Sequence, residues 1–366
     1  MKILMVFIKF PFVLSGIIFM CLIPFSTFSA DDKGLIGISL PASFQAFSDD
    51  SPWNTPVPES PEIDVDSDKM VKHLKDKSGI IKGDTVKWSI PLFVIDSTVC
   101  PRISIKSTKG ELYSTIDPDN NGTAENIPMP QGVWPDPEED AHMVLVDPEV
   151  NKVWEFSQAK QLSDGSWTAS IIDVWDLKGL GYRKPFYGSR WWRSGAMGGG
   201  MPLIAGLIRP EEIEAGVIRH ALLCATPINR KATQDGGSSE LCSPPASRTD
   251  GYGYGVEYIP EGARIQLDPT LDLDSLGLSE GSKTVAKAMQ QYGMIVGINS
   301  GTFKVFFQNL GTDAKAWEKY DHFHDLQNIP VENFRILKCN IVTKKTANSE
   351  TLGSWPGGQV YIEVTE

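Results

Sequence analysis

Asp140 and His142 are the first residue pair in this sequence that could carry out acid–base chemistry. They precede the apolar run 143–146, and side chains two residues apart on a strand project to the same face. A carboxylate beside an imidazole can orient the ring, raise its basicity or share a metal ion with it. The alternative interpretation is a buried, hydrogen-bonded pair that closes a loop.

His220 lies in the apolar stretch 217–225, which the sequence predicts to be a strand. On that strand His220 would share a face with Ile218 and Leu222, whereas Arg219 would point to the opposite face. Two interpretations stay open. His220 is a hydrogen-bonded core residue, or it belongs to a catalytic site.

Glu155 stands between Trp154 and Phe156 in a predicted strand, which should pair with the strand after His142 through a hairpin at 147–152. A buried carboxylate is costly unless it is paired, so Glu155 is either a structural partner or an acid with a tuned pKa. No cofactor is predicted, although this donor set would suit a divalent metal ion. The predicted catalytic residues are Asp140, His142, Glu155 and His220.

Aromatic residues in loops form the second kind of candidate, because flat rings can stack on sugar faces. Tyr252 follows Asp250 in a glycine-rich loop, and Arg248 lies just before them. Packing of the rings against the body of the protein is the alternative explanation. The predicted substrate-binding residues are Trp134, Trp191, Trp192, Arg219, Arg248, Asp250 and Tyr252.

Short apolar runs, punctuated by glycine, proline, asparagine and aspartate, dominate the elements that must position these residues. They predict a mostly β protein, a single β-sandwich or jelly-roll-like domain with a few short helices. Asn299 and Gly301 predict a second hairpin at 298–302. The predicted strands cover 88–95, 103–105, 143–146, 153–156, 167–172, 217–225, 264–267, 294–298, 304–307 and 360–364.

Helical periodicity is confined to short stretches. One helix is predicted at 66–77 with Ser67 as its N-cap. A second is predicted at 280–291, capped by Ser279 and closed by Gly293. Shorter helical turns are predicted at 210–215 and 313–320.

Residues 1–29 have the layout of a signal peptide, since two lysines precede an apolar run that small residues follow. Its removal would leave an extended segment at 30–61 and one β-rich domain at 62–366. The chain is therefore expected to be secreted or periplasmic, with no membrane span after cleavage. In an oxidising compartment, Cys224 and Cys242 are the favoured disulfide pair, because they flank a polar loop.

The 366 residues carry a net charge of −12, with 34 Lys and Arg against 46 Asp and Glu. This balance argues against a nucleic-acid partner, which would require phosphate neutralisation. The sequence has no Gly-x-Gly-x-x-Gly, Walker, His-Glu-x-x-His or Gly-x-Ser-x-Gly motif. Nucleotide chemistry is therefore disfavoured.

Several segments follow one another in a recognisable order: Ser-Pro-Trp-Asn-Thr at 51–55, Asp-Ala-His-Met-Val-Leu-Val-Asp at 140–147, Gly-Met-Pro-Leu-Ile-Ala-Gly-Leu-Ile-Arg at 200–209, Arg-His-Ala-Leu at 219–222, Pro-Glu-Gly-Ala-Arg at 260–264 and Tyr-Gly-Met-Ile-Val at 292–296. Nearly the whole chain after the leader thus resembles a widespread group of uncharacterised secreted bacterial proteins, often found beside carbohydrate-related modules. The resemblance implies secretion and an all-β fold, and no particular reaction. That group often carries Trp-Pro-Ala-x-His after the Arg-His-Ala-Leu segment, whereas residues 244–248 here read Pro-Pro-Ala-Ser-Arg.

These observations favour a secreted enzyme that cleaves a polysaccharide, with glycoside hydrolysis preferred to a lyase reaction. In a hydrolase, Asp140 and Glu155 would be the two carboxyl groups. In a lyase, His142 or His220 would abstract the proton beside a uronic-acid carboxyl group, with Arg219 or Arg248 stabilising the charge. The alternative is a non-catalytic extracellular glycan-binding or envelope protein, in which the aromatic residues bind and the histidines pack.

Overall fold

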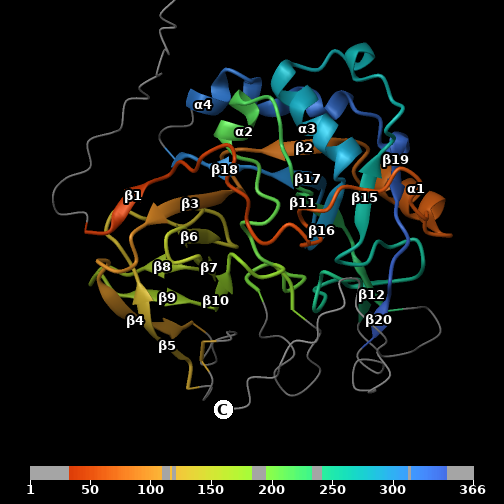
Figure 1. Cartoon of the computed structure of the whole chain (residues 1–366). Helices are drawn as coiled ribbons and strands as arrows, with labels where there is room; N and C mark the ends of the chain where they lie inside the picture. The colour runs from red at the N-terminus through yellow and green to blue at the C-terminus, as the bar shows by residue number, and fades with distance from the viewer. Residues whose placement is uncertain are drawn as a thin grey trace, which may run out of the picture.

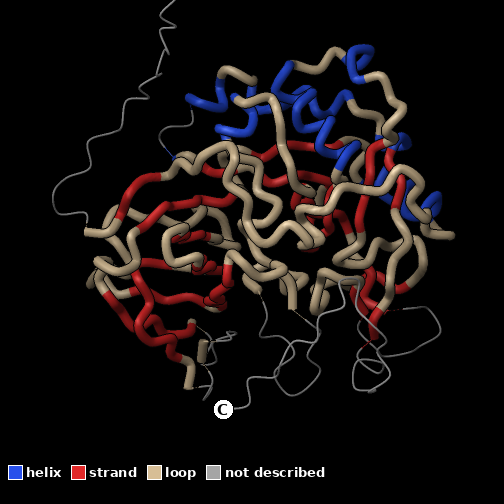
Figure 2. The backbone as a smooth tube through the Cα atoms, viewed as in Figure 1, coloured by secondary structure: helices blue, strands red, loops and turns tan. Residues whose placement is uncertain are grey.

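The structure is a computed structural model that describes residues 33–108, 116–117, 121–183, 195–232, 241–311 and 315–343. The predicted signal peptide, Trp191, Trp192 and the predicted strand 360–364 lie outside these residues. The described chain is mostly β, as predicted, and its sheets pack face to face in a sandwich-like arrangement with helices along one side (Figures 1 and 2).

The first large sheet has the strand order β1-β3-β6-β7-β10, and β18 pairs with β3. The predicted hairpin at 147–152 is present, because β6 and β7 pair antiparallel from Met143↔Phe156 to Asp147↔Lys152. Strands β3 and β6 pair in parallel, and local sequence patterns do not predict this pairing. The strands are β1 (Leu35–Gly37), β3 (Ile90–Ile95), β6 (Met143–Asp147), β7 (Lys152–Ser157), β10 (Ile171–Asp176) and β18 (Gln308–Asn309).

The second large sheet has the order β19-β15-β16-β11-β17-β2. Its central strand β11 pairs parallel with β16 and antiparallel with β17. The hairpin predicted at 298–302 is therefore wrong, since β11 lies between the two strands that this turn joins. The strands are β2 (Ile81–Asp84), β11 (Leu222–Pro227), β15 (Arg264–Leu267), β16 (Met294–Ser300), β17 (Phe303–Phe306) and β19 (Phe334–Ile336).

Successive side chains of a strand point to opposite faces of its sheet, so one strand can contribute to two different cores. Leu92 and Val94 of β3 join Leu223 and Ala225 of β11 in the core between the large sheets. The intervening residues face outward. Phe93 and Ile95 pack under a four-stranded sheet of order β5-β4-β9-β8, made of β4 (Arg102–Ser107), β5 (Thr123–Pro128), β8 (Lys160–Gln161) and β9 (Trp167–Ala169).

The helices cover the outer face of the second sheet (Figure 2). Helix α3 (Glu280–Gln291) has the predicted bounds, is capped by the Ser279 hydroxyl, and is followed by Gly293 at φ +71°. Asp66 rather than Ser67 is the N-cap residue of α1, because the Ser67 hydroxyl accepts a hydrogen bond from Ile336 N instead. The helices are α1 (Ser67–Lys77), α2 (Pro210–Glu214), α3, α4 (Lys315–Glu318), η1 (Leu273–Leu276), η3 (Asp321–Asn328) and η4 (Val331–Asn333).

Two further predictions need correction. The strand predicted at 217–225 begins only at Leu222, since Ala221 N donates to Trp53 O outside the sheet. The strand predicted at 167–172 is divided between β9 and β10, which belong to different sheets. None of the helices in the described part of the chain is long and apolar enough to cross a membrane.

The predicted disulfide between Cys224 and Cys242 is also wrong. Both are free thiols, and they lie in different cores, Cys224 under the helices and Cys242 between the large sheets. Cys242 belongs to the small strand pair of β13 (Leu241–Cys242) with β20 (Val342–Thr343). Burial raises the pKa of the Cys224 thiol far above its ordinary value.

Candidate functional site

The loop that leads from β5 into β6 carries four acidic residues within five positions, Asp136, Glu138, Glu139 and Asp140. We call residues 134–142 the acidic loop. A backbone hydrogen bond of 2.9 Å from Asp136 N to His142 O closes it, and the Asp136 carboxylate accepts one from Glu138 N at 3.2 Å. Prolines on both sides of Asp136 restrict the backbone, so the loop holds its acidic side chains in a fixed order.

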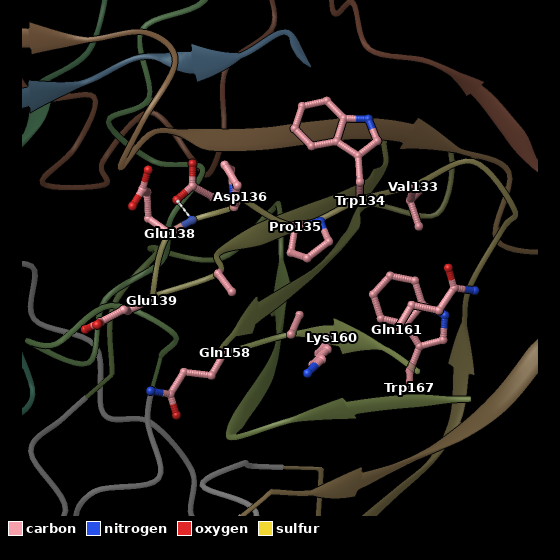
Figure 3. Close-up of a pocket in the computed structure, with 13 residues that line it drawn as sticks. Val133, Trp134, Pro135, Asp136, Glu138, Glu139, Gln158, Lys160, Gln161 and Trp167 are labelled. Atoms are coloured by element: carbon pink, nitrogen blue, oxygen red, sulfur yellow. Dashed lines mark hydrogen bonds between the residues drawn. The ribbon is translucent and has the colours of Figure 1, made fainter. Parts of the chain in front are cut away.

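On one side of the acidic loop lies a cavity of about 590 Å³, which we call the outer pocket. Figure 3 shows Asp136, Glu138 and Glu139 at one end of this pocket, with Trp134 and Trp167 toward the other. Trp134 is half-buried against Phe93, with ring centroids 5.5 Å apart. The outer pocket is lined by Val133, Trp134, Pro135, Asp136, Pro137, Glu138, Glu139, Ala141, Gln158, Ala159, Lys160, Gln161 and Trp167.

Asp136 has the most perturbed carboxyl group in the outer pocket. Burial raises its pKa to about 6, although hydrogen bonds from Glu138 N, Ser89 N and the Asn309 side chain oppose the rise. Its carboxyl group is therefore still largely protonated below pH 6. Glu139 is exposed and lines the pocket as well. One buried and one exposed carboxyl group in the same pocket could fill the two different roles of an acid–base pair.

A second cavity of about 470 Å³, named the inter-sheet pocket, lies between the acidic loop and the strands β2, β16 and β17 of the second large sheet. This inter-sheet pocket shares Glu139 with the outer pocket. Lys304 is its central cation: its ammonium group lies 3.0 Å from an Asp84 oxygen and donates to Trp88 O at 3.2 Å. The inter-sheet pocket is lined by Asp84, Trp88, Glu139, Asp140, Ile298, Asn299, Ser300, Gly301, Thr302, Lys304 and Phe306.

Asp140 and His142 lie close together, although neither is part of a strand. Asp140 lines the inter-sheet pocket, whereas His142 lies beneath the loop with 4% of its surface exposed. Burial lowers the pKa of His142, and the nearby Asp140 carboxylate opposes this shift. Burial thus favours the neutral form of His142 beneath the loop, whereas Asp140 is only partly buried.

Glu155 lines neither pocket and lies on the face of β7 that points to the second large sheet. It is fully buried, stands opposite Asp173 of β10, and accepts a hydrogen bond from Ile204 N at 2.9 Å. Burial raises its pKa to about 8, and the charge of Asp173 adds to the rise. We therefore place Glu155 in the interior of the sandwich, outside the candidate site.

His220 belongs to a third, separate environment at the start of β11. Its Nε2 lies 3.0 Å from a Glu212 oxygen, and the Arg209 guanidinium lies 2.9 Å from the same oxygen. Arg209 also donates to Pro41 O and Phe44 O, so this buried cluster fastens the N-terminal segment to α2. Arg219 is exposed on the preceding loop.

Arg209→Met should lower the free energy of unfolding by roughly 3 kcal/mol, because the buried carboxylate of Glu212 would lose its guanidinium partner. Urea unfolding of the variant measures the loss. Lys72→Met is a matched control, because the ion pair of Lys72 with Asp76 lies at the surface. Equal stability of the Arg209 variant and the control would contradict a structural role for this cluster.

Arg248 and Asp250 meet the glycine-rich loop 195–200. Arg248 is mostly buried and donates to the carbonyl oxygens of Gly195, Met197 and Gly198. Asp250 is exposed; its carboxylate accepts a hydrogen bond from Asn299 N, and its own backbone N donates to Glu261. Burial raises the pKa of Glu261 well above its usual value. Arg248 therefore supports a loop, whereas Asp250 remains at the surface beside a residue of the inter-sheet pocket.

The metal hypothesis for Asp140, His142, Glu155 and His220 is wrong, because these residues occupy three separate environments. Within the described ranges, no group of three or more His, Cys, Asp and Glu side chains is arranged to hold a metal ion. The residues that the sequence reasoning missed are Asp136, Glu139 and Lys304. The acidic run directly after Trp134 is the signal that could have drawn attention to the first two.

Comparison with known protein families, with curated proteins and with solved structures finds no match to this chain. The acidic loop and its two pockets therefore provide the basis for a functional assignment.

Proposed function

We propose that the protein is a secreted glycoside hydrolase whose active site is the outer pocket. The observation that carries this proposal is Asp136, a carboxyl group with a pKa of about 6 that lines the same pocket as the exposed Glu139. Two carboxyl groups flanking a sugar linkage are the usual machinery of glycoside hydrolysis.

In the proposed reaction, the carboxyl group of Asp136 donates its proton to the glycosidic oxygen as the bond from that oxygen to the anomeric carbon breaks. Glu139 acts on the opposite side, either by taking a proton from the attacking water or by attacking the anomeric carbon itself. The added water supplies the hydroxyl group of one product and the hydrogen of the other. Trp134 and Trp167 give the pocket apolar surface for a sugar ring.

A non-catalytic glycan-binding protein is the second candidate. The deep burial of Asp136, which has 2% of its surface exposed, favours it, since a proton donor must reach the glycosidic oxygen. Under this alternative the outer pocket binds a sugar and leaves the linkage intact.

Incubation of the purified protein with a panel of neutral, acidic and amino polysaccharides separates the candidates. Hydrolysis predicts new reducing ends without ultraviolet absorbance from a carbon–carbon double bond. Because only protonated Asp136 can donate, the rate should fall about tenfold per pH unit above its pKa of about 6. New reducing ends accompanied by ultraviolet absorbance would indicate a lyase, and retention on a polysaccharide without cleavage would indicate a binding protein.

A further inference from the structure

We propose that Tyr252 and Tyr254 form a docking site for a polysaccharide chain on the surface of the protein, separate from the outer pocket. The inference rests on the proposed function, because it extends glycan recognition to a second place. The two side chains are 58% and 54% exposed, which is unusual for rings of this size.

The segment 251–256 alternates glycine with a larger residue, and the alternation decides which side faces solvent. A Cβ atom at Gly251 would lie 2.6 Å from Asn229 O, and one at Gly253 would lie 2.5 Å from the Tyr258 ring. Because these two glycines have no Cβ atom, the backbone can lie in close contact with the body of the protein. Tyr252, Tyr254 and Val256 consequently form one exposed row.

The backbone beneath this row is held firmly. Strand β14 (Gly253–Tyr254) pairs with β12 (Arg230–Ala232), and Gly253 N donates to Asn229 O at 2.9 Å. The buried guanidinium of Arg230 donates to Tyr258 O at 2.7 Å and to Val256 O at 2.6 Å. A ligand would therefore meet rings whose backbone is already in place, which reduces the entropy lost on binding.

The chemistry of the row fits a neutral glycan. Tyr252 directly precedes β14, and side chains two positions apart in an extended chain are separated by roughly 7 Å, so the two rings can stack on neighbouring sugars. Neither tyrosine hydroxyl has a hydrogen-bond partner among the described residues, so both are free for sugar hydroxyl groups. The adjacent carboxylates of Asp250 and Glu257 disfavour an anionic membrane or a polyanion.

The position of the row also agrees with a glycan partner. Asp250, two residues before Tyr252, accepts a hydrogen bond from Asn299 N, and Asn299 lines the inter-sheet pocket. A polysaccharide chain bound to the two tyrosines would thus lie next to the inter-sheet pocket, which borders the acidic loop.

The test measures depletion of the full-length protein from solution by insoluble cellulose, chitin, xylan and starch. We expect wild type to be retained by at least one polymer, and the Tyr252→Ala/Tyr254→Ala variant to bind that polymer about tenfold more weakly. Tyr252→Phe/Tyr254→Phe should keep most of the affinity because it keeps both rings. A Val65→Ala/Val86→Ala variant is the matched control, since it removes exposed apolar groups elsewhere.

Cleavage of soluble oligosaccharides is measured in parallel, so that the docking site and the hydrolase activity are tested independently of each other. Unchanged cleavage by the double alanine variant supports a docking role, and its thermal unfolding midpoint checks that it is folded. Equal retention of this variant and wild type would overturn the inference. The inference would also be overturned if the wild-type protein cleaved soluble oligosaccharides but bound to none of the insoluble polymers. Tyrosine-dependent retention without any cleavage would instead overturn the proposed hydrolase and leave the docking site standing.

Discussion

Asp136→Asn should reduce the rate of glycan cleavage by about 10²–10⁴-fold, the range typical of losing a general acid. The amide has nearly the shape of the carboxyl group but cannot give up a proton to the glycosidic oxygen. Its one oxygen can still accept the hydrogen bonds that Ser89 N and the Asn309 side chain donate to Oδ1, whereas the hydrogen bond from Glu138 N to Oδ2 is lost. Initial rates on the polysaccharide identified by the panel, with circular dichroism of the variant, measure the effect.

A substrate with a good leaving group distinguishes an acid from a merely structural residue. An aryl glycoside with an acidic phenol needs little protonation, so Asp136→Asn should retain much more of its activity on that substrate than on the polysaccharide. Glu149→Gln serves as the control, because Glu149 lies in the exposed β6–β7 turn and lines neither pocket. Equal losses on both substrates would show that Asp136 supports the loop and does not donate the proton.

Local sequence patterns predicted the elements of the fold well. Helix α3 has its predicted bounds because one capping serine, an apolar stripe and a glycine at φ +71° all favour the same helix. The β6–β7 hairpin formed for a similar reason, since its turn joins two strands of matching apolar period. The hairpin at 298–302 failed because the partner of β16 is β11, about 70 residues away in sequence, and turn residues carry no information about such a strand.

The candidate site was only partly predictable. Trp134 and Asp140 were selected, and each lines a pocket at the acidic loop. Asp136 was missed because its pKa depends on burial and on Ser89 and Asn309, which come from distant parts of the chain. His220 was selected as a histidine on an apolar strand, yet its role is set by Glu212 and Arg209, whose positions only the tertiary structure reveals.

Glu155 gives the second large effect, on stability. In the unfolded chain a glutamate has a pKa near 4.5, whereas burial raises the pKa of Glu155 in the folded protein to about 8. The folded state therefore binds this proton more tightly than the unfolded state does between these two values. The resulting stability is fully present below pH 4.5 and is lost progressively up to pH 8, a total of about 5 kcal/mol.

Glu155→Gln should remove this dependence, because the amide does not titrate and its oxygen can still accept the hydrogen bond from Ile204 N. Urea unfolding at pH 5 and pH 8.5 gives the difference in stability between variant and wild type at each pH. We expect that difference to move in favour of the variant by several kcal/mol on going to the higher pH. Glu149→Gln, a change in the exposed β6–β7 turn, controls for the loss of one carboxylate from an acidic protein. If the difference between Glu155→Gln and wild type is the same at both pH values, Glu155 is ionised in the folded sandwich, and the raised pKa of its buried carboxyl group is wrong.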